Sequence, residues 1–168
     1  MSSQRIIGID PGSRITGVGI IDSDGRHNRC VYHGAIKMAT APLPDRLGEI
    51  FQGVSALIEL YQPTQMAIED VFVAKNPSSA LKLGQARGAA ICAGIVNKLT
   101  VAEYSAREVK LAVVGKGSAE KTQVQHMIRI LLNIQGKLQA DAADGLGVAI
   151  CHAHHRDFKQ RIMKQSTL

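Results

Sequence analysis

The chain has 168 residues, enough for one well-packed domain but short for two, and its composition (45% hydrophobic, 20% charged) excludes a disordered or fibrous protein. Its formal charge of +6 favours an anionic partner such as nucleic acid. No apolar run approaches the ~20 residues that span a bilayer, and the first residues carry no secretion signal, so we expect no membrane partner.

Three short strands joined by tight turns are predicted for the first part of the chain. Residues 5–10 (RIIGID) form an apolar run that ends in the turn Pro11-Gly12-Ser13. A second run, residues 17–21, ends at a hairpin signal that contains Asp24-Gly25. Residues 30–38 predict a third strand, so the three strands are expected to form an antiparallel meander.

The hydrophobic period then changes to that of a helix, which is expected between Pro44 and Pro63. Residues 65–69 (QMAIE) predict a fourth strand, short and buried. Residues 70–79 are expected to form a loop, because the Asn76-Pro77 pair disfavours a helix there.

The second half of the chain predicts mainly helices. In the helix expected over residues 80–98, small residues at four-residue steps share a face that would let another backbone approach closely: Ala80, Gly84, Gly88 and Cys92. A fifth strand is expected at residues 100–104, and helices are expected at 106–114, 119–132 and 140–155. This order predicts an α/β fold, a mixed five-stranded sheet flanked by helices in a single domain. The domain is expected over residues 1–156, followed by a frayed basic tail over residues 157–168.

Four carboxylates are the candidates for a catalytic site. Asp10 and Glu69 end the first and fourth strands, so they would emerge at the same sheet edge if these strands are parallel neighbours. Asp141 and Asp144 are three residues apart on a predicted helix and share one face among small apolar residues. Taken singly, each acid has an ordinary structural explanation: a turn before Pro-Gly, an exposed strand end, or helix N-terminal acids favoured by the dipole.

Taken together, the four acids predict a metal site. Like charges that converge are unfavourable unless cations neutralise them, and oxygen-only ligands favour Mg²⁺, with Mn²⁺ as a substitute. Two such ions about 3.5–4 Å apart are the usual device for in-line phosphodiester displacement. One ion activates the attacking water and the other stabilises the leaving 3′-oxygen, so the acids predict phosphodiester cleavage, and the basic remainder of the chain would hold the polyanionic substrate.

Several motifs together resemble the bacterial RuvC family of Holliday-junction resolvases. The matching segments are residues 8–13 (GIDPGS), 67–72 (AIEDVF), 74–76 (AKN), 80–88 (ALKLGQARG), 115–121 (GKGSAEK) and 140–144 (ADAAD). The similarity is collinear from about Arg5 to His155, and the combination is specific, whereas the GIDPG motif alone is not.

The resemblance implies a ribonuclease H-like fold and a homodimeric, magnesium-dependent endodeoxyribonuclease. Such an enzyme resolves four-way junctions in DNA recombination and repair by paired symmetric nicks that leave 5′-phosphate and 3′-hydroxyl ends. The resemblance makes Asp10, Glu69, Asp141 and Asp144 the catalytic, metal-binding acids, which are the four chosen from the residues themselves. It also implies a preference for thymine-containing sites and action with a junction branch-migration motor complex.

Four further residues are candidates for DNA contacts. Phe72 either stacks on an unpaired base at the junction centre or anchors a buried loop, and Lys75 lies beside it. Lys110 and Lys121 resemble family lysines near the scissile strand, although either is equally compatible with a solvated helix lysine. Lys82 and Arg87 are weaker candidates for phosphate contacts.

The cysteines and histidines carry less information about function. The three cysteines are scattered without a CxxC pair, which is typical of reduced thiols and, with the bacterial family resemblance, predicts a cytoplasmic, nucleoid-associated protein. The cluster from Cys151 to His155 contains residue types that bind metals, which suggests a metal site. His152, however, lies about 16 Å along the helix from Asp141, too far to share its metals, so we expect a solvent-facing helix end.

Other classes of function stay open on the sequence alone. An actin-like or sugar-kinase-like ATPase also carries a Gly-Ile-Asp-x-Gly hairpin, but such proteins need a second domain of this kind and have no evident use for Asp141 and Asp144. A DNA-structure binder that does not cleave, or a related nuclease that acts on RNA, would also account for the basic charge and the acids. Nucleotide binding would identify an ATPase, whereas only activity separates the nucleic-acid-binding classes.

Overall fold

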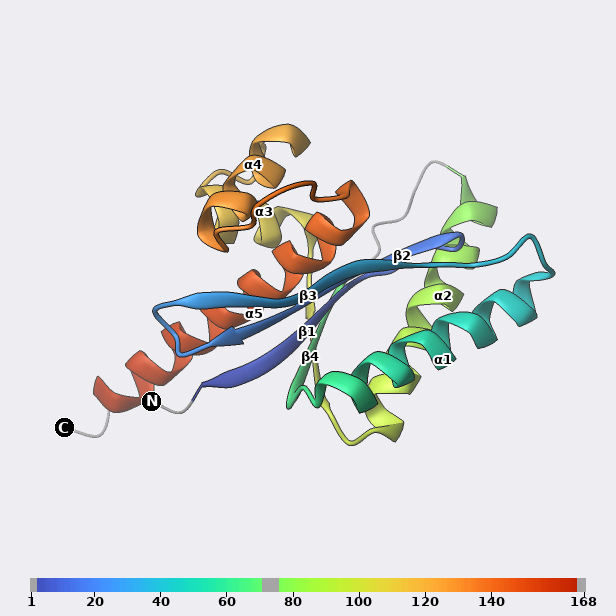
Figure 1. Cartoon of the computed structure of the whole chain (residues 1–168), viewed down its shortest axis with the longest axis horizontal. Helices are drawn as coiled ribbons and strands as arrows, with labels where there is room; N and C mark the ends of the chain where they lie inside the picture. The colour runs from blue at the N-terminus through green and yellow to red at the C-terminus, as the bar shows by residue number, and fades with distance from the viewer. Residues whose placement is uncertain (1–2, 71–75, 166–168) are drawn as a thin grey trace.

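Helices cover both faces of one five-stranded sheet (Figure 1). The computed structural model describes residues 3–70 and 76–165. Within these residues the elements are, in chain order, β1 (Gln4–Asp10), β2 (Ile15–Ser23), β3 (Asn28–Lys37), α1 (Leu43–Tyr61), β4 (Gln65–Glu69), α2 (Pro77–Val96), β5 (Thr100–Tyr104), α3 (Ala106–Val114), α4 (Lys121–Leu131) and α5 (Ala140–Gln165). The predicted α/β class with a mixed five-stranded sheet is confirmed.

The strand order is β3-β2-β1-β4-β5. Strands β1, β2 and β3 form the predicted antiparallel meander, with Gly8 opposite Gly19. Strand β4 pairs in parallel with β1, and β5 in parallel with β4, so the chain crosses over by way of α1 and α2. The carboxyl ends of β1, β4 and β5 therefore lie at one edge of the sheet.

Two hydrophobic cores lie on opposite faces of the sheet, because side chains alternate along each strand. Ile7 and Ile9 pack with α1 and α2 on one face. Ile6 belongs to the core on the other face, where α3, α4 and α5 cover the sheet. Figure 1 shows this division, with α5 on one side of the strands and α1 and α2 on the other. Local alternation of apolar residues thus decides which helices meet which face.

Helix α5 approaches the sheet so closely that glycines are required beneath it. A Cβ atom at Gly17 would overlap the main-chain carbonyl of Asp141, and one at Gly8 would overlap that of Gly145. On the helix side, a Cβ at Gly145 would lie 2.7 Å from the backbone nitrogen of Gly19. Because these positions are glycines, the first turns of α5, which carry the two acids, can pack in direct backbone contact with β1 and β2.

Helix α2 differs from its prediction at its start and on its small-residue face. Asn76 and Pro77 start the helix instead of breaking it: the Asn76 side chain accepts a hydrogen bond from the Ser78 N–H, and proline at the first helical position loses no bond. The predicted close approach is not made within the described residues, because added Cβ atoms at Gly84 and Gly88 would meet nothing within 4 Å.

Helix α5 extends beyond its predicted end at His155 and continues to Gln165. After Gly147 the sequence contains neither glycine nor proline, so nothing stops the helix there. The predicted boundary at residue 156 falls inside this helix, and the division of the chain at that point stays a prediction. Among residues 3–70 and 76–165, no helix is both long and apolar enough to cross a membrane.

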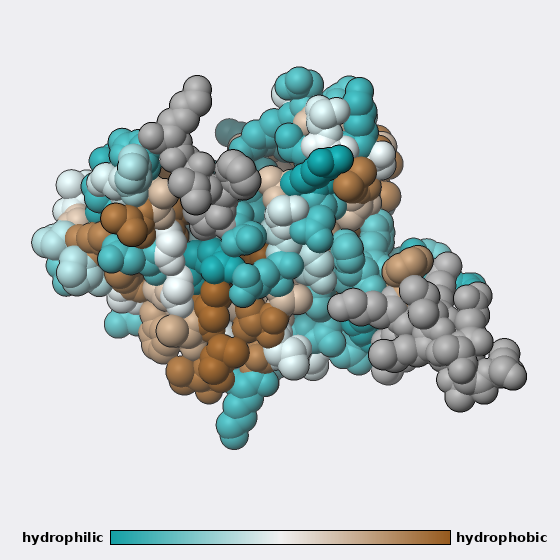
Figure 2. Space-filling model, turned by 180° about the vertical axis from the view of Figure 1, so that it is seen from behind, coloured by the Kyte–Doolittle hydropathy of each residue, from teal (hydrophilic) through white to brown (hydrophobic). Residues whose placement is uncertain are grey.

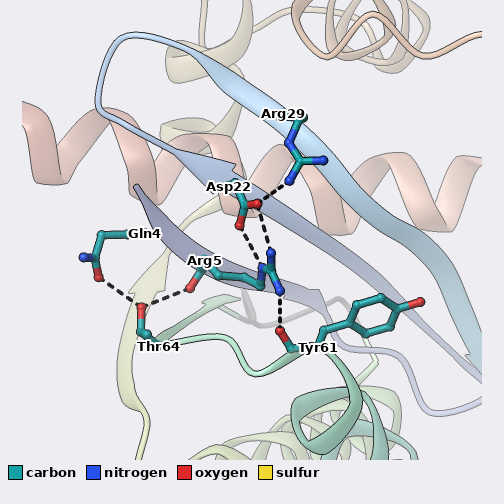
Figure 3. Close-up of polar contacts among 6 residues, drawn as sticks. All are labelled: Gln4, Arg5, Asp22, Arg29, Tyr61 and Thr64. Atoms are coloured by element: carbon teal, nitrogen blue, oxygen red, sulfur yellow. Dashed lines mark hydrogen bonds and ion pairs between the residues drawn. The ribbon is translucent and has the colours of Figure 1, made fainter. Parts of the chain in front are cut away.

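An ionic network holds the sheet at the edge opposite the carboxyl ends (Figure 3). Asp22 on β2 accepts a hydrogen bond from the Arg5 Nε at 2.8 Å and from Arg29 on β3 at 2.7 Å. The bond from Arg5, ahead of that from Arg29, lowers the pKa of Asp22 despite its burial. Arg5 also donates to the carbonyl of Tyr61, at the end of α1. The network ties three strands to one helix, away from the four acids.

Candidate active site

Asp10 and Glu69 lie at the carboxyl ends of neighbouring strands, as the sequence predicts. The parallel register pairs Ile9 with Ile68, which places the residue after each of them side by side. Both carboxylates line a cavity of about 220 Å³ at this edge of the sheet. Its other lining residues come from α3, α4 and α5: Ala106, Val109, Lys110, Lys121, Val124, Ile128, Asp144 and Gly147.

Helix α5 brings the remaining two acids to the same edge. Asp144 lines the cavity opposite the strand ends. Asp141, one turn earlier, does not line it, but its main chain packs on Gly17 of β2 and its charge contributes to the pKa of Asp10. The i,i+3 spacing therefore places both carboxylates beside β1, as expected from helix geometry.

The cavity is electrostatically unfavourable for negative charge. Burial, followed by the charges of Glu69 and Asp144, raises the pKa of Asp10 to about 7, with Lys121 acting in the opposite direction. Burial and the charge of Asp144 also raise the pKa of Glu69, which Lys121 and Lys110 offset in part. A carboxyl that is protonated near neutral pH, at the end of a strand among other acids, indicates a site built to receive cations.

Two lysines supply positive charge at the rim of the cavity. The Lys121 Nζ lies 2.8 Å from Asp144 Oδ2, and this hydrogen bond is the main reason why the pKa of Lys121 is raised. Lys110 comes from α3 and faces Glu69 closely enough to affect its pKa. Lys110 and Lys121, predicted from the sequence, thus lie at the acids, whereas the predicted contacts Phe72 and Lys75 fall outside the described residues.

The donor atoms suit a hard divalent cation. They are carboxylate oxygens, which Mg²⁺ and Mn²⁺ prefer, and their mutual repulsion is what a bound cation relieves. Among the described residues, however, no group of three or more His, Cys, Asp or Glu side chains is already arranged around a common point as metal ligands. In this arrangement the Lys121 ammonium neutralises part of the charge on Asp144.

Arg87 has a role that sequence reasoning missed. Its guanidinium forms an ion pair with Glu103 on β5 and lies 3.5 Å from Asp70, the residue after Glu69. The side chain is only 18% exposed and is held by these ion pairs, and its contact with a phosphate stays a prediction from the sequence. It ties α2 to the carboxyl ends of β4 and β5. No local signal reveals this pairing, because its members come from α2, from β5 and from the residue that follows β4.

The expectation of a solvent-facing helix end at His152 is wrong. The His152 ring is half-buried, with Nδ1 2.9 Å from the Tyr104 hydroxyl and Nε2 2.8 Å from Gln65 Oε1. Gln65 begins β4, so the histidine lies toward the end of that strand opposite Glu69. The helix continues past it, which removes the helix-end argument. His152 therefore links α5 to β4 and β5, and it is separate from the four acids.

The fold and the acidic cavity together define a class of protein, the ribonuclease H-like α/β proteins with carboxylates at the ends of the central strands. A family model described as crossover junction endodeoxyribonuclease RuvC matches residues 6–152. The chain belongs to the RuvC family. This membership decides against an actin-like ATPase.

Individual relatives agree with this assignment over nearly the whole chain. A crossover junction endodeoxyribonuclease RuvC of Dichelobacter nodosus is 59% identical over 155 residues, covering 92% of this chain and 88% of the relative. That of Methylococcus capsulatus is 56% identical and covers 95% of this chain and 96% of the relative. Among solved structures, T. thermophilus RuvC in complex with a Holliday junction substrate matches with a TM-score of 0.87 and 28% identity, covering 93% of this chain and 96% of that one.

Proposed function

We propose that the protein is a crossover junction endodeoxyribonuclease that resolves four-way DNA junctions during recombination and repair. It makes paired, symmetric nicks that leave 5′-phosphate and 3′-hydroxyl ends. The observation that carries the proposal is the cavity lined by acids and two lysines at the carboxyl ends of the strands. It lies in a chain whose family is described as crossover junction endodeoxyribonuclease. The relative solved with a Holliday junction supports four-way DNA as the substrate.

The catalytic residues of the proposal are Asp10, Glu69, Asp141 and Asp144, which would hold two Mg²⁺ ions, with Mn²⁺ as a substitute. When bound, such ions activate a water and stabilise the leaving 3′-oxygen. The carboxylates supply oxygen ligands and stay ionised once a cation offsets their repulsion. Lys110 and Lys121 attract the scissile phosphate and neutralise charge that develops on it.

Cleavage of defined DNA substrates tests the function. The protein is incubated with a mobile four-way junction, linear duplex and single-stranded DNA of the same sequence, with and without Mg²⁺, and the cuts are mapped. We expect paired nicks at symmetric positions of the junction only, ligatable without further processing, and only when the metal is present. Cleavage of linear duplex or of single-stranded DNA at the same rate as the junction would contradict the proposal.

Two variants give the experiment its controls. Asp10→Asn keeps the shape of the side chain but removes a ligand, so we expect binding to the junction without cleavage. Glu59→Gln removes a carboxylate from the exposed surface of α1, away from the cavity, and should cut like the wild-type protein. An Asp10→Asn protein that cuts at the wild-type rate would show that the acid cluster is not the catalytic centre.

The proposal includes a homodimer, because two strands of opposite polarity must be cut and a two-fold pair of sites suits that symmetry. Helix α2 offers a surface for it. Leu81 and Val96 are 70% and 67% exposed, and the space above Gly84 and Gly88 is open among the described residues. Figure 2 shows apolar surface gathered at the lower middle of one face of the molecule. A second α2 packed against this helix would bury Leu81 and Val96 and bring two backbones close together.

The dimer is tested by light scattering at micromolar concentration. We expect the mass of two chains for the wild-type protein and of one chain for Leu81→Glu, because a charge in an apolar interface is costly. Ile130→Glu, on α4 at the opposite face of the sheet, is the matched control and should stay dimeric. A wild-type protein that is monomeric with and without junction would refute the dimer. The branch-migration motor and association with the nucleoid stay predictions from the family resemblance.

A further inference from the structure

A second cavity, of about 350 Å³, lies beyond the turn that follows Asp10. It is built from the β1–β2 turn, the end of β3, the segment after it and the first turns of α1. Its lining residues are Arg14, Ile15, Lys37, Met38, Ala39, Thr40, Ala41 and Arg46. None of them lines the acidic cavity, so the two cavities are separate. We call this one the basic cavity.

The charge of the basic cavity is entirely positive. Arg14, Lys37 and Arg46 line it, and no carboxylate does. None of the ion pairs among the described residues involves these three side chains. Glu49, on the same part of α1, accepts a hydrogen bond from the Ala39 N–H at 2.9 Å instead. The cavity therefore gathers three positive charges that form no ion pair among the described side chains.

Arg46 adds an unused hydrogen-bond donor. Its terminal nitrogen donates to the carbonyl of Ser13 at 2.8 Å, which fixes the side chain against the β1–β2 turn. Its Nε is buried and has no partner among the described residues. A buried donor without a partner is unfavourable, so the environment of this side chain is incompletely satisfied. The Arg46 side chain thus lines the cavity in a position already fixed by its bond to the turn.

The position of the cavity relates it to the cleavage site. Arg14 follows Asp10 by four residues, so the Cα atoms of the two residues are at most roughly 14 Å apart. A nucleic-acid strand advances about 3.4 Å per nucleotide, so this Cα separation corresponds to about four nucleotides. Lys110 and Lys121 belong to the helices on one face of the sheet, whereas α1 covers the other face. Positive charge therefore flanks the four acids from both faces.

We propose that the basic cavity is a second phosphate-binding site, which holds a DNA backbone phosphate within about four nucleotides of the scissile one. The inference rests on the proposed function and extends it by giving the strand a path. The strand passes from the lysines of α3 and α4, across the acids, to Arg14, Lys37 and Arg46. Because the cavity binds phosphate rather than bases, it fixes the position of the strand without reading its sequence.

The salt dependence of junction binding tests the number of phosphates held. The variant Arg14→Gln/Lys37→Gln empties the cavity of two charges but keeps Arg46, which also holds the turn. We expect the slope of log affinity against log salt concentration to fall by about 0.9, the effect of losing one phosphate contact. Arg26→Gln, in the exposed hairpin at the opposite end of the β2–β3 ladder, is the matched control and should leave the slope unchanged.

A second experiment needs no variant. Junctions with a single neutral methylphosphonate at successive positions around the cut are bound by the wild-type protein. We expect one position outside the scissile phosphate, within about four nucleotides, to weaken binding roughly tenfold, and the double variant to lose sensitivity at that position only.

The outcomes separate this inference from the proposed function. Suppose the wild-type protein binds and cuts junctions, but the double variant matches Arg26→Gln in slope and in its methylphosphonate pattern. This result would refute phosphate binding by the basic cavity and leave the proposed function intact. A wild-type protein that neither binds nor cuts the junction would overturn the proposed function and the inference with it.

Discussion

Neutralising Asp10 should stabilise the metal-free protein, and the gain should grow with pH. The pKa of Asp10 is raised from 3.8 to about 7, first by burial and then by the charges of Glu69 and Asp144. A carboxyl with a raised pKa binds its proton more tightly in the folded state. Stability is therefore greatest below about pH 4 and is lost as the pH rises through 7. Asp10→Asn removes this titration.

The size of the effect follows from the two pKa values of Asp10, 3.8 unfolded and about 7 folded. Each unit of difference corresponds to about 1.4 kcal/mol in the free energy of unfolding. Ionisation of Asp10 then costs about 1.5 kcal/mol at pH 5, where only the unfolded state is ionised, and about 4 kcal/mol at pH 8, where both states are. The advantage of Asp10→Asn over the wild-type protein should grow by about 2.5 kcal/mol between these pH values.

Urea unfolding in EDTA measures this difference directly. Midpoints and slopes are recorded for both proteins at pH 5 and pH 8, and then again at pH 8 with saturating Mg²⁺. A metal that binds only the folded wild-type protein should reduce or reverse the advantage of the variant. Equal advantages at pH 5 and pH 8 would refute the reasoning, since the cluster of acids would then impose no electrostatic strain on Asp10.

Three further predictions concern neighbours of the site. Gly17→Ala should lower the free energy of unfolding by about 1–3 kcal/mol in urea melts, because its Cβ would overlap the Asp141 carbonyl. Gly48→Ala, on α1 with open space around it, should instead raise the free energy of unfolding by about 0.5–1 kcal/mol. Equal effects of the two substitutions would contradict the close packing of α5 against Gly17. Lys121→Met should slow junction cleavage roughly a hundredfold while changing stability by less than about 1 kcal/mol. The exposed Lys116→Met is its control, and similar rates for both would exclude Lys121 from the reaction. Tyr104→Phe should cost about 1–2 kcal/mol of stability by removing the bond to His152, without changing the cleavage rate at saturating DNA; a slower rate with unchanged stability would contradict this structural role.

Much of the fold was predictable because the signals that define it are local. Residues 65–69, 100–104 and 106–114 have the bounds expected from apolar alternation and helical period, and in the structure Ser105 caps the last of them. The start of α2 was missed because Asn-Pro can precede a helix as well as end one, and only the Asn76 cap decides between them. The end of α5 was missed because a basic, polar segment without Gly or Pro is compatible with either helix or tail.

The sequence by itself determined the elements, the strand ends that carry Asp10 and Glu69, and the shared helix face of Asp141 and Asp144. These follow from periodicity and spacing, which act between residues near one another in the chain. Only the tertiary structure decided what depends on packing between distant segments. It packs α5 against the glycines of β1 and β2, and it forms the ion pairs of Lys121 with Asp144 and of Arg87 with Glu103. It also brings three basic side chains to one cavity: Arg14, Lys37 and Arg46. No local pattern encodes such contacts, because each depends on the depth and direction at which one element packs on another.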